Sequence, residues 1–235
     1  MMADKEALFG THVLREVCED KKKDLATMAY EQLKRAIIYD ELQVGDMLSE
    51  NSIAASMNMS RTPVREAFRR LSADGLIAIL PGRGAFVKPI TLSEQHDIYE
   101  LRLVMECFAA QTAVYNIKAE ELAQVEQVWL EMLERDKAGR LDWVDMLIQD
   151  EILHKLILTN CSNKQLGKVM ESISMMNFRY MMYAAKALHR PLETIQQHLD
   201  IIELIKKRDA DNLVRALKEH ITNSERLILS SFANS

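Results

Sequence analysis

Apolar residues recur at helical spacing along most of the 235-residue chain, and the clearest example lies between Ser60 and Leu71. Four apolar side chains in this stretch follow i, i+3, i+4 and i+7 and so share one face of a helix: Val64, Ala67, Phe68 and Leu71. Three arginines follow the adjoining face at four-residue intervals: Arg61, Arg65 and Arg69. The pattern predicts a helix with one face toward a core and one cationic face.

An arginine stripe of this kind is usually the solvated face of a surface helix. A DNA-binding role is therefore predicted only if the neighbouring sequence supports it. A second helix is predicted at residues 49–57, before the arginine-bearing helix, and only residues 58 and 59 separate the two. Ser60 or Thr62 can cap the first turn of the later helix, where Pro63 is tolerated because first-turn amides lack an intrahelical acceptor. Helix, tight turn and helix form the arrangement of a DNA-reading unit.

An extended pattern follows the two helices. Residues 76–80 form a short apolar run, and residues 81–84 (PGRG) turn the chain into the apolar residues 85–87. This pattern predicts a hairpin with Arg83 at its tip, placed to meet phosphates or the minor groove. With a further helix predicted at residues 24–40, the segment reads as a winged helix-turn-helix.

Helical periodicity returns at Leu92, and Thr91 with Glu94 forms a capping-box signature just at that point. Six helical segments are predicted: 92–116, 118–138, 142–159, 163–187, 191–207 and 209–232. The absence of a fixed repeat favours a compact bundle of six or seven helices over a solenoid. The predicted fold class is therefore mainly α, with an N-terminal arm (1–23), a winged helix-turn-helix domain (24–90) and an all-helical domain (91–235).

Charge is distributed unevenly along the chain. The formal net charge of -5 argues by itself against a nucleic-acid partner. Residues 51–90, however, hold six basic residues against two acids, whereas residues from 91 onward hold 17 basic and 22 acidic residues. The cationic patch is thus confined to the predicted DNA-reading segment.

Cysteine usage and hydropathy indicate the cellular setting. The three cysteines, Cys18, Cys107 and Cys161, are widely spaced and form no CxxC pair, so neither a disulfide framework nor a cysteine metal site is predicted. No apolar run approaches the ~20 residues of a membrane span, and the first residues lack a signal-peptide pattern. We expect a cytoplasmic protein without membrane association.

Histidines and one aspartate in the helical domain have a spacing compatible with metal binding. Asp150 and His154 are four residues apart and share a helix face, and His198 and His220 lie on later predicted helices. Two imidazoles from neighbouring helices could complete a cluster with open coordination positions. Isolated helical histidines are, however, more often surface or core residues than ligands, and spacing alone does not separate these readings.

The run LSENSIAASMNMSRTPVREAFRRLSADGLIAILPGRGAFV, residues 48–87, resembles the DNA-binding domain of the GntR family of bacterial transcription regulators. The helical remainder is similar to the ligand-sensing FCD domain of the FadR branch, and HDIYELRLVMECFAA, residues 96–110, looks like the opening helix of that domain. The resemblance covers about residues 25–232. It implies a homodimer that reads a palindromic double-stranded operator and acts, as is usual in the family, as a repressor.

The resemblance assigns DNA contacts to named residues. It places Arg61 and Arg65 in the major groove, where a bidentate arginine to guanine contact supplies ~1 to 3 kcal/mol of discrimination. Thr62 could touch a phosphate or a thymine methyl group, and Asn51 stands where some relatives carry an arginine. The expected DNA-binding residues are Ser60, Arg61, Thr62, Arg65, Gly82 and Arg83. Arg69 and Arg70, further from the helix start, are expected to meet phosphate or neighbouring acids.

The resemblance also implies a metal and an effector. Many FCD domains bind a divalent ion through one Asp and three His in this order along the chain, which corresponds to Asp150, His154, His198 and His220. These nitrogen and oxygen donors suit Zn, Ni or Mn. The implied effector is a small carboxylate metabolite that meets the metal and Arg102, although a surface salt bridge between Arg102 and Glu106 is the competing interpretation. Two further effector candidates are Asn177 and Arg179.

The sequence thus favours a bacterial transcription regulator, not an enzyme, whose operator affinity changes when an organic acid binds at the metal site. A metal-dependent hydrolase that uses the Asp/His cluster to activate water is the alternative from another class. It leaves the arginine-bearing helix unexplained. A third possibility is an ion that only stiffens the bundle.

Overall fold

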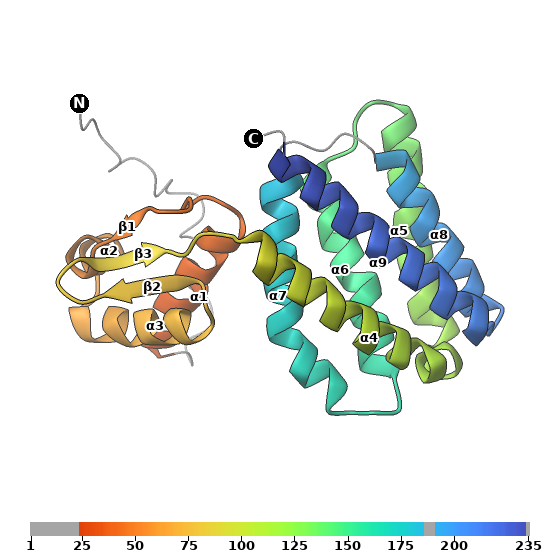
Figure 1. Cartoon of the computed structure of the whole chain (residues 1–235), viewed down its shortest axis with the longest axis horizontal. Helices are drawn as coiled ribbons and strands as arrows, with labels where there is room; N and C mark the ends of the chain where they lie inside the picture. The colour runs from red at the N-terminus through yellow and green to blue at the C-terminus, as the bar shows by residue number, and fades with distance from the viewer. Residues whose placement is uncertain (1–23, 186–190, 234–235) are drawn as a thin grey trace. The chain divides into compact units, whose positions relative to one another are not determined.

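The computed structural model describes residues 24–185 and 191–233, and the predicted N-terminal arm lies outside this part of the chain. The chain divides into two compact units between Pro89 and Ile90. The described residues form nine helices and one three-stranded sheet, so the fold is mainly α, as predicted (Figure 1).

The first unit is a winged helix-turn-helix. Its helices are α1 (Leu25–Ile38), α2 (Glu50–Ser56) and α3 (Arg61–Ala73). Its strands are β1 (Met47–Leu48), β2 (Ile77–Leu80) and β3 (Gly84–Val87), arranged antiparallel in the order β1-β3-β2. The predicted hairpin is β2 and β3, in register from Ile77 opposite Val87 to Leu80 opposite Gly84. Strand β1 was not predicted, because two residues are too few to show a period.

Helix α3 has the two faces that its sequence predicts. All four predicted core residues are buried: Val64, Ala67, Phe68 and Leu71. The helix packs against α1, and all three arginines of the stripe are exposed. Asn58, in the turn between α2 and α3, has φ of 50°, a conformation that asparagine tolerates better than most residues. Ser60 occupies the N-cap position of α3, but its side chain makes no capping hydrogen bond.

Arg70 departs from the expected role. Its guanidinium lies 3.9 Å from the centre of the Tyr30 ring and donates a 3.1 Å hydrogen bond to the Thr27 hydroxyl, both on α1. Tyr30 in turn donates to Asp74, just after α3, at 2.5 Å. Arg70 therefore fastens α3 to α1, whereas Arg69 pairs on the surface with Glu66 at 3.4 Å.

The second unit is a bundle of helices α4 (Leu92–Asn116), α5 (Ala119–Lys137), α6 (Trp143–Asn160), α7 (Leu166–Ala185), α8 (Pro191–Lys206) and α9 (Ala210–Ala233). The predicted segments match these helices to within a few residues. The largest difference is at the start of α7, where the Asn163 side chain accepts from the Gln165 amide and holds a turn. Among the helices that the structure describes, none is long and apolar enough to cross a membrane.

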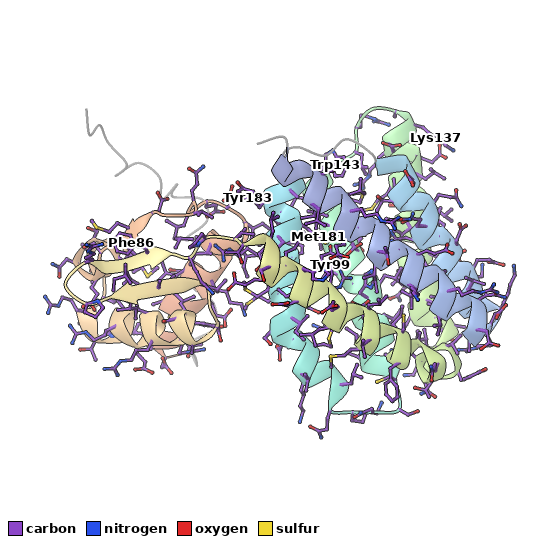
Figure 2. All side chains as sticks on the ribbon, viewed as in Figure 1. Phe86, Tyr99, Lys137, Trp143, Met181 and Tyr183 are labelled. Carbon is purple, nitrogen blue, oxygen red and sulfur yellow. The ribbon has the colours of Figure 1, made fainter. Side chains whose placement is uncertain are left out.

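Helix α4 is central to the bundle and packs against α6, α7 and α9. It begins as its sequence predicts, since the Thr91 hydroxyl accepts from the Glu94 amide at 3.2 Å. A large core cluster includes the buried Trp129 and residues of every helix in this unit. A smaller cluster joins Tyr99 of α4 to residues of α7 and α9, and Met181 packs against it (Figure 2). Within this frame, the inward faces of α4, α6, α7, α8 and α9 carry the polar side chains described below.

Candidate functional site

The exposed face of α3 presents two arginines that are held by side chains of α2. Arg61 donates from Nη1 to Asn51 Oδ1 at 3.3 Å. Arg65 donates from Nε and Nη2 to the two carboxylate oxygens of Glu50 at 3.2 and 3.0 Å. This pairing is bidentate, the same geometry in which a guanidinium binds the edge of guanine. Arg65 also lowers the pKa of the Glu50 carboxyl.

The other predicted DNA-facing residues are also on the surface. Ser60 and Thr62 are exposed at the start of α3, and Arg83 is exposed in the turn of the wing. Gly82, in the same turn, has φ of 71°, a conformation that favours glycine. Glu50 was missed by sequence reasoning, because only the turn between α2 and α3 brings it against Arg65, fifteen positions later.

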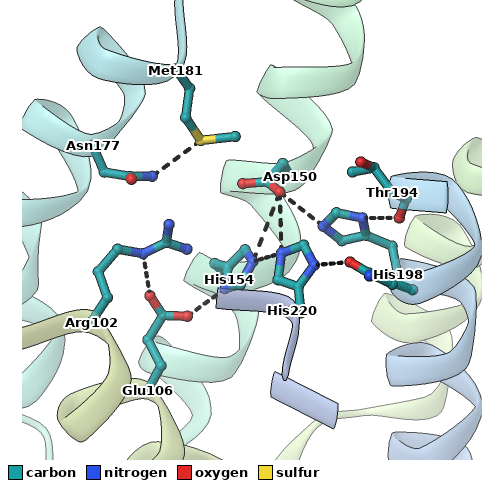
Figure 3. A network of polar contacts seen from close by, with 10 residues as sticks. Arg102, Glu106, Asp150, His154, Asn177, Met181, Thr194, His198 and His220 are labelled. Atoms are coloured by element: carbon teal, nitrogen blue, oxygen red, sulfur yellow. Dashed lines mark hydrogen bonds and ion pairs between the residues drawn. The ribbon is translucent and has the colours of Figure 1, made fainter. Parts of the chain in front are cut away.

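The structure brings the four predicted metal ligands together in the interior of the second unit (Figure 3). Asp150 and His154 come from α6, His198 from α8 and His220 from α9. One ligand atom from each lies within 4.8 Å of the others, and all four residues are buried. Asp150 Oδ1 lies 2.9 Å from His198 Nε2, 3.6 Å from His220 Nε2 and 3.9 Å from His154 Nε2.

Each imidazole uses its outer nitrogen for another contact. His198 Nδ1 lies 2.7 Å from the Thr194 carbonyl oxygen, and His220 Nδ1 lies 3.0 Å from Gln197 Oε1. His154 Nδ1 pairs with the Glu106 carboxylate. With a proton on Nδ1, a neutral imidazole would direct its Nε2 lone pair into the cluster, where His154 Nε2 and His220 Nε2 lie 3.2 Å apart.

This arrangement fits a cation better than it fits a hydrogen-bond network. Asp150 Oδ1 and His198 Nε2 face each other at 2.9 Å, yet neither makes a hydrogen bond of acceptable geometry. Both atoms are acceptors when His198 carries its proton on Nδ1, and two buried acceptors in contact are unfavourable without positive charge between them. The four residues therefore form a buried cluster that could hold a metal ion.

The charges around the cluster follow from burial. Burial, followed by the nearby His198, lowers the pKa of His220 to about 3, which keeps this imidazole neutral. Burial opposes ionisation of Glu106, but Arg102 and His154 outweigh it and lower the pKa of this carboxyl to about 2. Burial by itself would lower the pKa of His154, because it disfavours the charged imidazolium. The carboxylates of Glu106 and Asp150 outweigh this effect and raise the pKa. An ion bound here would therefore compete with protonation of His154.

The effector candidates are all buried, but they do not share one place. Arg102 Nε donates to Glu106 Oε1 at 2.7 Å, so the predicted pair exists, although it lies in the interior and not on the surface. The guanidinium and Asn177 lie on the same side of the cluster in Figure 3. Arg179 is two positions beyond Asn177 on α7, about 200° around the helix, and therefore belongs to a different face. Glu106, which joins Arg102 to His154, was missed as a site residue.

The winged helix-turn-helix and the separate helical bundle with its buried polar cluster define a DNA-binding transcription regulator. The chain belongs to the family described as "Bacterial regulatory proteins, gntR family", which matches residues 25–87, and its second unit is an FCD domain, matched over residues 97–223.

Relatives with assigned names support this placement. The chain is similar to the HTH-type transcriptional repressor RspR of Escherichia coli K12, with 32% identity over 193 residues that cover 82% of this chain and 83% of RspR. It is 30% identical over 202 residues to the gluconate operon transcriptional repressor of Bacillus subtilis, covering 82% of this chain and 80% of that protein. These relatives are transcription regulators and not enzymes, so they do not support the alternative of a metal-dependent hydrolase.

Solved structures show the same fold. E. coli McbR/YncC matches with a TM-score of 0.75 at 19% identity, covering 89% of this chain and 99% of that chain. The metal-free FCD domain of TM0439 matches with a TM-score of 0.52 at 21% identity, covering 63% of this chain and 99% of that one. At these identities the similarity is one of architecture.

Proposed function

We propose that this protein is a homodimeric repressor whose affinity for a palindromic operator is changed by a small organic acid bound beside a divalent metal ion. The observation that carries the sensing half of the proposal is the convergence of one ligand atom each from Asp150 and three buried histidines within 4.8 Å of one another. The DNA-binding half follows from the family and from the exposed arginines of α3. Repression is supported by the names of RspR and the gluconate operon repressors.

The DNA-reading residues in this proposal are those predicted from the sequence. Arg61 and Arg65 would read base edges, Ser60 and Thr62 would contact the backbone beside them, and Gly82 and Arg83 would bring the wing to the DNA. Two such domains in a symmetric dimer would read two half-sites about one helical turn apart.

The proposed ligands of the ion are Asp150, His154, His198 and His220. Nitrogen and carboxylate donors suit Zn, Ni or Mn. One carboxylate and three neutral imidazoles around a divalent ion leave a net charge of about +1, while Glu106 and Arg102 compensate each other. The site then favours an anion, and the ion supplies a coordination position for a carboxylate. Arg102 and Asn177 would contact the same acid, and Arg179, on another face of α7, is the weaker candidate.

An exposed apolar stripe on α4 supports the dimer. Four large apolar side chains are spaced in steps of three, four and seven residues along one face of this helix: Leu101, Val104, Phe108 and Tyr115. These side chains are between 47% and 68% exposed. A contiguous exposed apolar patch of this kind typically marks an interaction site. Alternating steps of three and four residues are the spacing with which two helices pack side by side. A second copy of α4 would cover the stripe symmetrically.

Charged substitutions in this stripe are expected to give a monomer. Replacing Val104 and Phe108 together by glutamate would put two carboxylates in the proposed interface, where burying an unpaired charge costs several kcal/mol. The molar mass, measured by light scattering after size exclusion, should fall to that of one 27.0 kDa chain. The control is Val169→Glu on α7, an exposed apolar residue outside the stripe, which should leave the dimer intact. A dimer that survives both glutamates would refute this interface.

The coupling between acid and operator is testable on the whole protein. A ligand changes DNA affinity only if it favours one arrangement of the two DNA-binding domains over another, and such coupling is typically ~1 to 3 kcal/mol, or about 5- to 150-fold. We expect a shift of this size when carboxylic acids are titrated against metal-loaded protein on DNA selected from a random pool by the wild type. Chelation or Arg102→Met should abolish the shift. If no acid changes the affinity, the sensing half of the proposal fails.

A further inference from the structure

One of the three clustered histidines is held differently from the other two. His154 and His220 each direct Nδ1 at a side chain of another helix. His198 Nδ1 instead lies 2.7 Å from the carbonyl oxygen of Thr194, one turn earlier on its own helix. This contact sets the tautomer of His198, but it does not tie the ring to a neighbouring helix. The plane of the imidazole therefore depends on another contact.

The neighbouring helix reaches His198 through the ring of Trp129. Trp129 lies on α5, which packs against α8. Its indole is stacked on the imidazole, with the ring centroids 4.0 Å apart and an angle of 11° between the two planes. Both residues are 0% exposed. The indole thus covers one face of the imidazole and restrains its tilt, while the edge that carries Nε2 stays directed at Asp150, 2.9 Å from Oδ1.

Core packing alone does not account for a tryptophan at this position. Trp129 Nε1 is buried and makes no hydrogen bond of acceptable geometry with any residue that the structure describes. A buried N–H group without an acceptor costs free energy, and a phenylalanine or leucine would fill a core without that cost. The side chain that carries this cost is also the one that lies flat against a proposed metal ligand.

A stacked indole would act on a bound ion in two ways. It would hold His198 with Nε2 directed into the cluster, which reduces the side-chain freedom that coordination otherwise has to remove. An imidazole that coordinates a divalent ion also becomes electron-poor, whereas the face of an indole is electron-rich, so the stack is stronger with the ion than without it. Both effects favour the occupied site over the empty one.

We propose that Trp129 is a positioning residue of the metal site, and that the stacked face of its indole raises the affinity of the site for a divalent ion. The inference rests on the proposed function, in which the four clustered residues hold the ion. It adds a residue of α5, a helix that supplies none of the four ligands.

The experiment compares the metal affinities of full-length, chelator-treated variants by competition with a chromophoric chelator for Zn, Ni or Mn. Trp129→Leu removes the aromatic face and should weaken binding by roughly 10- to 100-fold, the range for loss of a residue that supports a metal ligand. Trp129→Phe keeps a smaller aromatic face and should stay within about 5-fold of the wild type. The matched control is Trp143→Leu, because Trp143 is the other tryptophan of the chain and packs against the same core. This control should keep the wild-type affinity.

Fluorescence supplies a second measurement, which needs no leucine variant. In Trp143→Phe, Trp129 is the remaining tryptophan of the chain. Its emission should change as Zn binds and should level off at one ion per chain. A tryptophan that only fills the core would lower the melting temperature of the metal-free protein when replaced, without changing the metal affinity.

The possible failures point to different conclusions. Three results would overturn the role of the stacked ring and leave the metal site standing: wild-type affinity in Trp129→Leu, equal losses in Trp129→Leu and either Trp129→Phe or Trp143→Leu, and emission that Zn leaves unchanged. A wild type that binds none of the three ions would overturn the metal site as well.

Discussion

Arg65→Ala is expected to abolish specific operator binding without unfolding the protein. The side chain is 51% exposed and takes no part in the core, so its removal leaves the buried face of α3 intact. A bidentate arginine contact to guanine is worth ~1 to 3 kcal/mol, and a dimer would lose two of them, a loss of roughly 30-fold to more than 10,000-fold in affinity. The measurement is a mobility-shift titration on DNA selected by the wild type, with circular dichroism to check the fold.

The matched control is Arg69→Ala, which removes the same charge one helical turn later. Arg69 is also exposed and pairs only locally with Glu66, so its loss should weaken binding to all sequences by a similar, smaller factor. Undiminished specific binding by Arg65→Ala would contradict its assignment as the base-reading residue. Equal, sequence-independent losses for both variants would assign Arg65 to phosphate instead.

The bidentate pair with Glu50 bears on the role proposed for Arg65. Glu50 holds the guanidinium through Nε and Nη2, which reduces its freedom before DNA arrives; a contact to guanine would use the remaining N–H groups or replace this pair. The pair is solvent-exposed, so its direct effect on stability is small. Its effect should instead lie in how Arg65 is presented to DNA.

Local periodicity predicted α3 well, because its apolar residues lie on one face and its arginines on another. It says less about α4 and α6, which bury charged and polar residues such as Glu106 and Asp150. It also predicted the wing, since a four-residue turn rich in glycine and proline separates two apolar runs. It could not predict β1, which is two residues long and owes its existence to pairing with β3. A strand of this size is specified by its partner and not by its own sequence.

Side-chain partners across helices were harder to predict than helix faces. Spacing showed that Arg102 and Glu106 share a face of α4, but it did not show that this face is the interior, where Glu106 also meets His154. The same limit hid Glu50. Spacing within one helix predicts which residues of that helix are neighbours. It does not predict which other helix packs against them, because that depends on the whole fold.

Glu106 contacts both the arginine proposed to bind the acid and one of the proposed ligands of the ion. Its two carboxylate oxygens contact different groups, Oε1 the guanidinium of Arg102 and Oε2 the imidazole of His154. Arg102 pairs with Glu106 through Nε, which leaves its other nitrogens for a carboxylate, and an ion bound at His154 Nε2 would leave the Nδ1–H of this ring donating to Glu106. The two proposed binding events would therefore share one buried side chain.

Asp150→Asn is expected to remove metal binding and, with it, the stabilisation that the ion gives. The substitution keeps the shape of the side chain but removes the only carboxylate among the four clustered residues. An ion present at 100 times its dissociation constant stabilises the folded state by about 2.7 kcal/mol, which for a chain of this size is a melting shift of roughly 5 to 11 °C. Differential scanning fluorimetry of chelator-treated protein with added Zn, Ni or Mn should show this shift in the wild type alone. Elemental analysis should show the same loss of ion.

The metal-free proteins separate loss of the ion from damage to the fold. The introduced amide can donate to His198 Nε2, which lies 2.9 Å from the replaced oxygen, so the metal-free variant should melt close to the metal-free wild type. His96→Ala is the control, because this histidine is exposed and pairs with Glu225 away from the cluster; it should keep the full metal-dependent shift. A wild type that melts at the same temperature with chelator and with each ion, or a variant that retains one ion per chain, would show that the four residues do not form the metal site. If chelation lowers the melting temperature but leaves the acid response of DNA binding unchanged, the ion only stiffens the bundle and takes no part in binding the acid.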